Sequence, residues 1–526
     1  MSLLHFLLEK IKVQLLKRFR LPANAILLGN GYPFGKRPKS RPIFLDLAQL
    51  QNPHMICTGG SGCGKTRLLY FLVTQLIRQS FPVVIVFDPH GDLHGNLLNF
   101  LAELPLPEVA KRLILIEPYE AYRRGRTPGI NVLEVEGEDD DPAKGYELID
   151  EQVGCFKVNW RDSWGERMSS ILRNGFRLLQ FSKLTLTEMP LLLMDKYVRG
   201  HLASHITDED LLAFLAFFSE FKDSEQHFFV ESARSRCEAF TQNPYIRRII
   251  GQSTSTIRFY DLINKPGTVI LINASRNHLK SEARRLFCSL LFSKLHAAIL
   301  ARENIPEEER IPLYIFADEA HEIYYPEAFQ SILEGGRKFK SYFGGIFHQT
   351  LAQFDEFGEK DTEVILANTG VKAVFQVNRN DAERYAKEMF SFARKYIKDQ
   401  PRDLLGTKGR AAYFSVQEQQ ENITNELQSQ QVREMHDHLK DGKSNQPFVA
   451  VTSIIEYSPS DPEGVEALRT AFYTQYARPN EEIDAERKRR RQLLQNAEWI
   501  TSESSTTSTQ EPEPAKVNLD DDDGWV

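Results

Sequence analysis

The sequence predicts an α/β fold with a large, mostly parallel β-sheet and an all-helical insertion. Two observations predict the sheet. Apolar runs such as 55–58 and 83–88 alternate with helical patterns on both sides of the insertion, and this alternation is typical of a parallel sheet with crossover helices. A third observation predicts the insertion, because long helical patterns without strand candidates fill residues 141–261. A chain of 526 residues with 41% hydrophobic content has ample material for a packed core.

The first twenty residues predict an amphipathic basic helix. Leucine and isoleucine recur at helical spacing from Leu4 to Leu15, with lysine and arginine between them and onward to Arg20. The charges follow the apolar start and no small-residue cleavage site is present, so we do not expect a signal peptide. The segment either docks on the protein's own core or on a partner, or makes a peripheral contact with an anionic membrane surface.

Composition narrows the class of protein. No stretch approaches the about 20 uninterrupted apolar residues of a membrane-spanning helix, so we expect a soluble or peripheral protein. The five cysteines are scattered without CxxC spacing, which favours a reducing cytoplasm over a disulfide framework or a zinc site. The net charge of -7 excludes a uniformly basic coat but leaves DNA contacts on one face open.

Residues 25–47 predict two strands, and the stretch 54–92 then follows the order strand, glycine-rich loop, helix, strand. The loop is Gly59, Gly60, Ser61, Gly62, Cys63, Gly64, Lys65 and Thr66, which fits the pattern GxxxxGK[ST]. Glycines there let backbone N–H groups point at phosphate oxygens, while Lys65 reaches the β- and γ-phosphates and Thr66 ligates Mg²⁺. We therefore predict an ATP site. Cys63 fits as a small tolerated side chain better than as a redox group, because no resolving partner is nearby.

A second apolar run, 313–317, ends in Asp318 and Glu319. In P-loop ATPases the first acid of such a pair holds Mg²⁺, usually through water, and the second polarises the attacking water. Alone, the pair would more simply cap the next helix. Together with the glycine-rich loop it predicts ATP hydrolysis.

The rest of the chain predicts further strands and a polar end. The strand candidates are residues 112–117, 268–272, 342–347, 371–377, 411–416 and 448–452. After a helix at 462–476, the basic run Arg487–Arg491 predicts a solvated helix face, with phosphate contact as the alternative. A Ser/Thr/Glu/Pro-rich tail follows and predicts disorder. Its acidic end, Asp520–Val526, is interpreted as a docking segment for another protein, a solubiliser or an internal DNA mimic.

Several stretches carry a family resemblance in their order and spacing. They are DPHGD at 88–92, NPYIRRIIGQ at 243–252, TVILINAS at 268–275, LEGGRKF at 333–339, GIFHQTLAQF at 345–354 and ANTGVKAVFQV at 367–377. With the glycine-rich loop and the acid pair, this set resembles the HerA/FtsK superfamily of P-loop DNA-pumping ATPases. Within that superfamily it looks like the soluble ATPase part of type IV conjugative coupling proteins, the TraG/TraD-like group.

The resemblance implies a RecA-like ATPase domain carrying an all-α domain, assembled as a hexameric ring around DNA. On this basis the parts of the chain are a basic helix (1–24), the RecA-like domain (25–140 and 262–456), the all-α insertion (141–261), C-terminal helices (457–498) and a disordered acidic tail (499–526).

The resemblance also implies roles for residues outside the two nucleotide motifs. Gln349 would sense the γ-phosphate, although His348 precedes it where relatives more often have Thr or Asn. Arg337 would reach the phosphate bound by a neighbouring subunit. Arg247, Arg248 and Arg410 are rivals for that role.

We expect an ATP-hydrolysing motor that translocates DNA in conjugation-like transfer or in DNA processing by a mobile element. Three alternatives stay open: a type IV secretion ATPase that acts on protein, a soluble HerA-like ATPase in DNA-end processing or anti-phage defence, and a nucleotide-gated scaffold. The membrane spans of anchored coupling proteins are not found in this sequence. DNA-stimulated hydrolysis would separate these readings.

Overall fold

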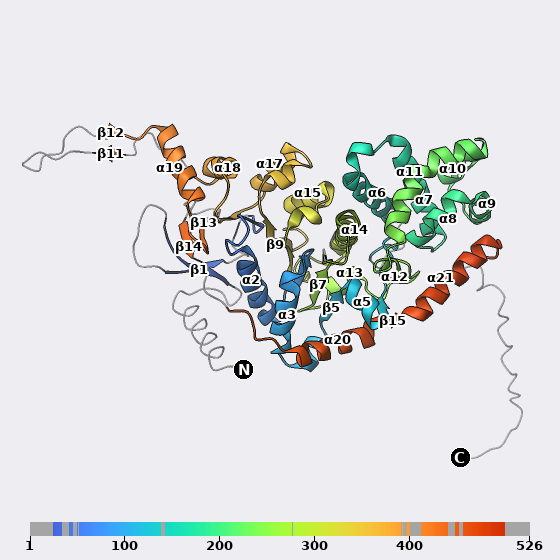
Figure 1. Cartoon of the computed structure of the whole chain (residues 1–526), viewed down its shortest axis with the longest axis horizontal. Coiled ribbons are helices and arrows are strands. Elements are labelled where there is room, and N and C mark those ends of the chain that lie inside the picture. The colour runs from blue at the N-terminus through green and yellow to red at the C-terminus, as the bar shows by residue number, and fades with distance from the viewer. Residues whose placement is uncertain are drawn as a thin grey trace, which may run out of the picture.

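The computed structural model shows a central sheet flanked by helices, with a group of helices beyond one end of it (Figure 1). The structure describes residues 25–33, 41–45, 50, 52–137, 142–275, 277–390, 392, 397–399, 412–439, 448–451 and 456–499. The predicted helix in residues 1–24, Arg410 and the tail from residue 500 onward lie outside the described residues.

In the described part of the chain, eleven strands form one sheet in the order β2-β1-β14-β13-β10-β3-β9-β8-β4-β7-β5. From β10 to β5 every neighbouring pair is parallel. The strands are β1 (Ile26–Pro33), β2 (Arg41–Leu45), β3 (Met55–Thr58), β4 (Val83–Asp88), β5 (Leu113–Ile116), β7 (Val269–Asn273), β8 (Leu313–Ala317), β9 (Ser341–His348), β10 (Val371–Val374), β13 (Glu434–Leu439) and β14 (Phe448–Val451). The predicted fold class, a large and mostly parallel sheet, is confirmed.

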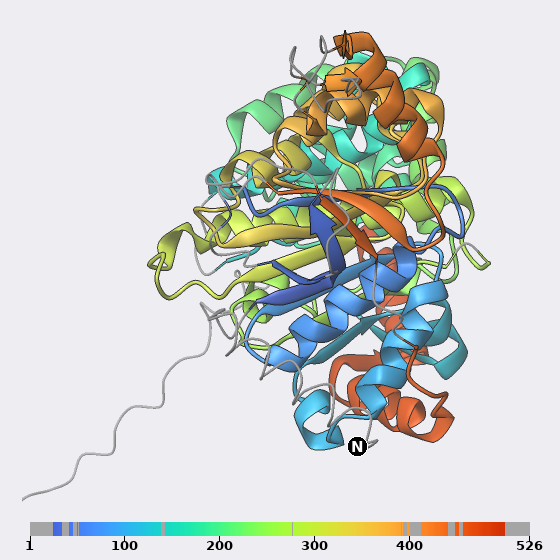
Figure 2. The same cartoon turned by 90° about the vertical axis from the view of Figure 1, so that its left-hand side faces the viewer.

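The parallel strands form the core of the molecule. Every residue of β4, VVIVFD, is buried, as expected for a parallel strand that is covered on both faces. Helices α2 (Lys65–Gln79) and α3 (Asp92–Ala102), blue in Figure 2, cover one face, and yellow to orange helices cover the other. The remaining helices around the sheet are α4 (Leu106–Ala110), α5 (Pro118–Arg124), α14 (Ser281–Leu300), α15 (Pro326–Gly335), α16 (Ala352–Asp355), α17 (Glu359–Ala367), α18 (Arg379–Met389) and α19 (Val416–Gln428).

The β2 edge of the sheet differs from the sequence prediction. There β2, β1, β14, β13 and β10 are joined by antiparallel pairs. A strand does lie within the predicted range 411–416, but β12 (Ala412–Tyr413) is shorter and pairs with β11 (Ile397–Asp399) in a separate ladder, not in the main sheet. Val416 instead begins α19, since Ser415 and Glu418 form a capping box in front of that helix.

Between β6 (Arg126–Pro128) and β7 the described chain is helical. The helices are α6 (Pro142–Asn159), α7 (Glu166–Phe181), α8 (Met189–Met194), α9 (Lys196–Ala203), α10 (Glu209–Ser219), α11 (Asp223–Thr241), α12 (Arg247–Ile250) and α13 (Phe259–Ile263), with short 3₁₀ turns between them. In α7 the periodic residues Met168, Ile171, Leu172 and Leu179 are all buried, so this apolar stripe forms the core of the helical region.

The C-terminal helices, red in Figure 1, run from the sheet to the helical region. Helix α20 (Pro462–Tyr476) packs on α3 and α4, strand β15 (Ala477–Pro479) pairs with β6, and α21 (Asn480–Gln495) packs on α9 and α12. The basic run is only partly a solvated face. Arg490 is buried, and it donates to Glu188 at 3.1 Å, Glu486 at 2.7 Å and the Gly251 carbonyl at 2.6 Å. Helical periodicity explains this, because Arg490 shares a face with Ile483 and Leu494.

No helix in the part of the chain that the structure describes is both long and apolar enough to cross a membrane.

Candidate active site

The glycine-rich loop joins β3 to α2 at the carboxyl edge of the parallel strands. Gly62 and Gly64 have φ values of 77° and 119°, in the left-handed region where glycine is favoured. Gly59 has no room for a side chain, because a Cβ there would lie 2.6 Å from the Cβ of Phe375. The loop is therefore held in its curve by its glycines and by the neighbouring strand β10.

Lys65 is the first residue of α2 and lies back along the loop. Its Nζ donates to the carbonyl of Gly59 at 2.6 Å and to that of Gly60 at 2.9 Å. Cys63 is buried inside the loop, and burial raises the pKa of its thiol. A thiol that stays protonated is a poor nucleophile, which agrees with the interpretation of Cys63 as a small packing residue.

The two acids follow β8, and the chain brings a third carboxylate beside them. Asp318 donates its backbone N–H to the Phe87 carbonyl at 3.0 Å, next to Asp88 at the end of β4. Asp318 is only 6% exposed, and burial, then Asp88 and Glu319, raise its pKa to about 7 against the opposing effect of Lys65. Glu319 has a φ of 50°, a strained conformation for a residue with a side chain. Such crowding and strain are typical of functional sites.

Gln349 follows the end of β9 and meets Glu319. Its Nε2 donates to Oε1 of Glu319 at 2.9 Å. Parallel strands β3, β8 and β9 are neighbours in the sheet, so their carboxyl ends bring together the glycine-rich loop, the acid pair and this amide. The structure thus gathers Lys65, Asp318, Glu319 and Gln349 in one place, as the sequence predicts.

His348 has a structural position. It is fully buried, its Nδ1 donates to the Thr350 carbonyl at 3.1 Å, and its Nε2 accepts from the Thr58 hydroxyl at 2.7 Å. This hydrogen-bond pattern assigns the tautomer, since a carbonyl only accepts. The Thr58 hydroxyl also bonds the Tyr385 hydroxyl. Burial lowers the pKa of His348 to about 3, so the neutral ring ties β9 to β3 beneath the site.

Arg337 is not brought to the phosphate loop of its own chain. It is exposed in the turn that precedes β9, whereas the glycine-rich loop follows β3 at the opposite edge of the parallel strands. Its neighbour Gly336 lies against His54, at the start of β3. Among the rivals, Arg248 donates to Asp484 in α21 at 2.6 Å. Any phosphate that Arg337 reached would have to be bound by another subunit.

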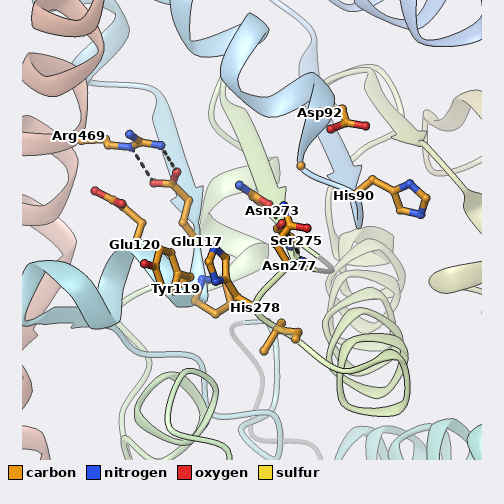
Figure 3. A pocket seen from close by; sticks show the side chains of 13 residues that line it. His90, Asp92, Glu117, Tyr119, Glu120, Asn273, Ser275, Asn277, His278 and Arg469 are labelled. Carbon is orange, nitrogen blue, oxygen red and sulfur yellow. Dashed lines mark hydrogen bonds and ion pairs between the residues drawn. The ribbon is translucent and has the colours of Figure 1, made fainter.

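Beyond these residues, a polar cavity of about 220 Å³ opens at the carboxyl ends of β4, β5 and β7 (Figure 3). Its lining residues include His90, Asp92, Glu117, Asn273, His278 and Arg469. Beside the cavity Asp88 caps α3, because its carboxylate accepts the N–H groups of residues 91, 93 and 94 at 2.7–2.9 Å. This explains the DPHGD motif in part.

Arg469 of α20 closes one side of that cavity. It donates to Glu117 at 2.6 Å (Figure 3), and His94 of α3 contacts the same carboxylate at 2.8 Å. Burial would raise the pKa of Glu117, but His94 and Arg469 lower it to about 2. Sequence reasoning missed this ion pair because Arg469 and Glu117 are 352 positions apart, and no local motif marks either residue.

Two family models match parts of this sequence. The family model "Helicase HerA, central domain" matches residues 32–139, and "TraM recognition site of TraD and TraG" matches residues 312–437. No curated protein matches the sequence. Plasmid coupling protein TrwB in complex with ADP and Mg²⁺ is 19% identical with a TM-score of 0.52, covering 84% of this chain and 97% of that one.

VirB4 of Thermoanaerobacter pseudethanolicus is 12% identical with a TM-score of 0.54, covering 83% of this chain and 98% of that one. At such identities the two solved structures show the shared fold. Taken with the two family models, they confirm the resemblance of this chain to HerA/FtsK-type ATPases of the conjugative coupling group.

Proposed function

We propose that this protein is a Mg²⁺-dependent ATPase. The observation that supports it most is the convergence of four groups at the carboxyl edge of β3, β8 and β9. These groups are the Lys65 amine, the buried Asp318 and Glu319 carboxylates, and the Gln349 amide that contacts Glu319 at 2.9 Å. A nucleotide-binding loop alone would need neither the second acid nor the amide.

The residues present fit ATP and Mg²⁺. Gly62 and Gly64 have the backbone conformation of an anion-binding loop. Asp88 and Glu319 each raise the pKa of Asp318, so a divalent cation would relieve repulsion that the fold has built in. Oxygen donors of this kind suit Mg²⁺. Thr66 and Asp318 would hold the ion, which supplies neutralisation of phosphate charge when bound.

The chain's own residues would bind the phosphates and activate the attacking water. Lys65 would leave the loop carbonyls for the β- and γ-phosphates. Glu319 would accept the proton of the attacking water at a carboxylate oxygen, while Gln349 would sense the γ-phosphate. TrwB has been solved in complex with ADP and Mg²⁺ and with the non-hydrolysable GTP analogue GDPNP.

Two substitutions test this assignment. Lys65→Ala should abolish nucleotide binding, because the amine that meets phosphate charge is lost. Glu319→Gln should keep ATP bound but block hydrolysis. Lys360→Ala, at an exposed position of α17, is the control and should match the wild type in both. A Glu319→Gln protein that hydrolyses ATP at the wild-type rate would refute the assignment of the water-activating acid.

We further propose that hydrolysis drives DNA through a hexameric ring in conjugation-like transfer. The two family models and the fold shared with TrwB support this reading. DNA should stimulate ATP hydrolysis, and mass measurement with ATP and DNA should show a ring. Stimulation by polypeptide in place of DNA would favour the secretion-ATPase alternative, which the fold shared with VirB4 keeps open.

The ring proposal assigns Arg337 to the site of the neighbouring subunit, where such an arginine is worth about 10³ to 10⁵ in turnover. Subunits with Lys65→Ala and subunits with Arg337→Ala should each be inactive alone. Mixed, they should recover activity, since an Arg337→Ala subunit keeps its Lys65 and receives Arg337 from its neighbour. No recovery with Arg337→Ala, but recovery with Arg247→Ala, would move the role to that rival.

We also propose that the acidic end, Asp520–Val526, docks another protein, and that residues 1–20 make a peripheral membrane contact. Four aspartates repel DNA phosphates, while Trp525 and Val526 offer an apolar anchor. Deletion of residues 517–526 should lose that partner and leave DNA-stimulated hydrolysis unchanged. Tighter DNA binding after deletion would instead identify an internal DNA mimic.

A further inference from the structure

A second glutamine contacts the water-activating acid one helical turn after Gln349. Gln353 lies in α16, and its Oε1 accepts the backbone N–H of Gln349 at 2.9 Å and that of Thr350 at 3.3 Å. Its Nε2 donates to Oε2 of Glu319 at 3.4 Å. Backbone N–H groups can only donate, so the amide oxygen must face them and the NH₂ group must face the carboxylate. The orientation of Gln353 is therefore determined by β9.

The two side-chain amides donate to different oxygens of the Glu319 carboxylate. Gln349 donates to Oε1 of Glu319 at 2.9 Å, and Gln353 donates to Oε2. The neighbouring ring of His321 is 3.6 Å from Oε2, and burial lowers the pKa of His321, so the neutral ring adds no fixed charge. The other charged groups near this ring are Glu322, Glu356 and Arg285. Glu319 is thus held at both oxygens by neutral donors from one segment.

The hydrogen bonds that Gln349 and Gln353 donate to Glu319 would respond differently to nucleotide. Gln349 holds Glu319 with its side chain, and it is the same side chain that would turn toward the γ-phosphate. Gln353 is anchored to the backbone N–H of Gln349, which a side-chain rotation leaves in place. Movement of the Gln349 side chain would therefore free Oε1 and leave Oε2 bonded. A hydrogen bond to a carboxylate weakens it as a base, so freeing Oε1 activates that oxygen alone.

We propose that Gln353 is a positioning residue that holds Glu319 by Oε2 while Gln349 releases Oε1 for catalysis. This inference rests on the ATPase function proposed above. In the step it serves, a water proton moves to Oε1 and the water oxygen bonds to the γ-phosphorus. The bond from that phosphorus to the β–γ bridging oxygen breaks, so ADP and phosphate are the products.

Gln353→Met in the full chain tests the proposal, because methionine has a similar length and cannot form these hydrogen bonds. We expect kcat for Mg²⁺-ATP to fall about tenfold, the size of effect expected for a misplaced general base. Affinity for a fluorescent ATP analogue, measured without turnover, should stay within about twofold. Gln330→Met is the matched control, since Gln330 also donates to a carboxylate, that of Glu334 at 2.8 Å, but on the exposed face of α15. It should leave kcat unchanged.

Two further readouts separate positioning from a general structural effect. In the Glu319→Gln background, Gln353→Met should cause no additional loss of single-turnover rate, because the group it positions is gone. Gln353→Glu places a second negative charge beside Glu319, so the acid limb of the pH–rate profile should move to higher pH. A profile that does not move would contradict the proposed contact.

A Gln353→Met chain with the wild-type kcat would overturn the proposal, and so would an equal loss of rate in the Glu319→Gln background. Both results leave the ATPase function standing if Glu319→Gln alone blocks hydrolysis. Wild-type hydrolysis that survives Glu319→Gln would refute the proposed function, and this inference with it.

Discussion

Asp318→Asn should make the nucleotide-free protein more stable, by an amount that grows with pH. Asp318 is 6% exposed, and burial, Asp88 and Glu319 raise its pKa to about 7, against about 3.9 in an unfolded chain. The folded state thus holds the proton more tightly than the unfolded state. The contribution of Asp318 to stability is therefore highest below about pH 4 and is lost as the pH rises through about 7.

The size of the effect follows from the two pKa values. Their difference of about 3 units, at 1.36 kcal/mol for each unit, gives about 4 kcal/mol lost by the wild type above about pH 8. Asparagine cannot ionise and avoids this loss, although it removes a group that the proposed hydrolysis mechanism needs. The site would then trade stability for activity, a pattern common at active sites.

Urea denaturation in the presence of a chelator, at one-unit steps from about pH 5 to about pH 8, measures this difference. Asp437→Asn is the matched positive control. Asp437 is fully buried, neither of its carboxylate oxygens has a hydrogen-bond partner among the described residues, and burial raises its pKa well above the ordinary value. Because an unfolded chain releases this proton above about pH 4 while the folded chain retains it to higher pH, this variant should also gain stability over the wild type as the pH rises. A flat difference for Asp318→Asn, beside a rising one for Asp437→Asn, would refute the reasoning.

Three other predictions concern the C-terminal helices. Arg469→Met removes one partner of the buried Glu117 carboxylate and should lower the free energy of unfolding by about 3 kcal/mol. Hydrogen exchange in α20 should then be about hundredfold faster. The control Arg123→Met, at an exposed ion pair, should change that exchange little. The pKa of Glu117 is lowered to about 2, so the stabilisation that this carboxylate gives the fold is complete above about pH 4.3 and is lost toward about pH 2. Hydrogen exchange in α20, followed at successively lower pH, measures this loss. Arg490→Met should expose α21 to limited proteolysis, whereas Arg491→Met, at an exposed position, should not.

Some errors of the sequence prediction have a clear physical cause. The strand predicted at 411–416 ends early, at Tyr413, because Ser415 and Glu418 form the capping box that begins the next helix. Strand β13 was missed because it places His436, Asp437 and His438 in the interior of the sheet. Strand propensity disfavours aspartate, so only pairing with β10 and β14 reveals this segment as a strand.

By itself, the sequence determined the fold class and the residues of the proposed nucleotide site. A glycine-rich loop needs particular residues at consecutive positions, since only they permit its backbone path. Lys65, Thr66, Asp318, Glu319 and Gln349 each follow an apolar run, and the carboxyl ends of adjacent parallel strands meet at one edge of a sheet. Such constraints are local or follow from strand order, so they can be read along the chain.

Only the tertiary structure decided which other polar groups support that machinery. His348 proved to be a neutral link between strands, Gln353 a second contact to Glu319, and Arg469 the partner of a carboxylate 352 positions away. Nothing adjacent in sequence distinguishes these residues from exposed polar ones. A buried polar group is stable only when packing brings it a hydrogen-bonding or charged partner, and that partner is chosen by how the helices and strands pack in space.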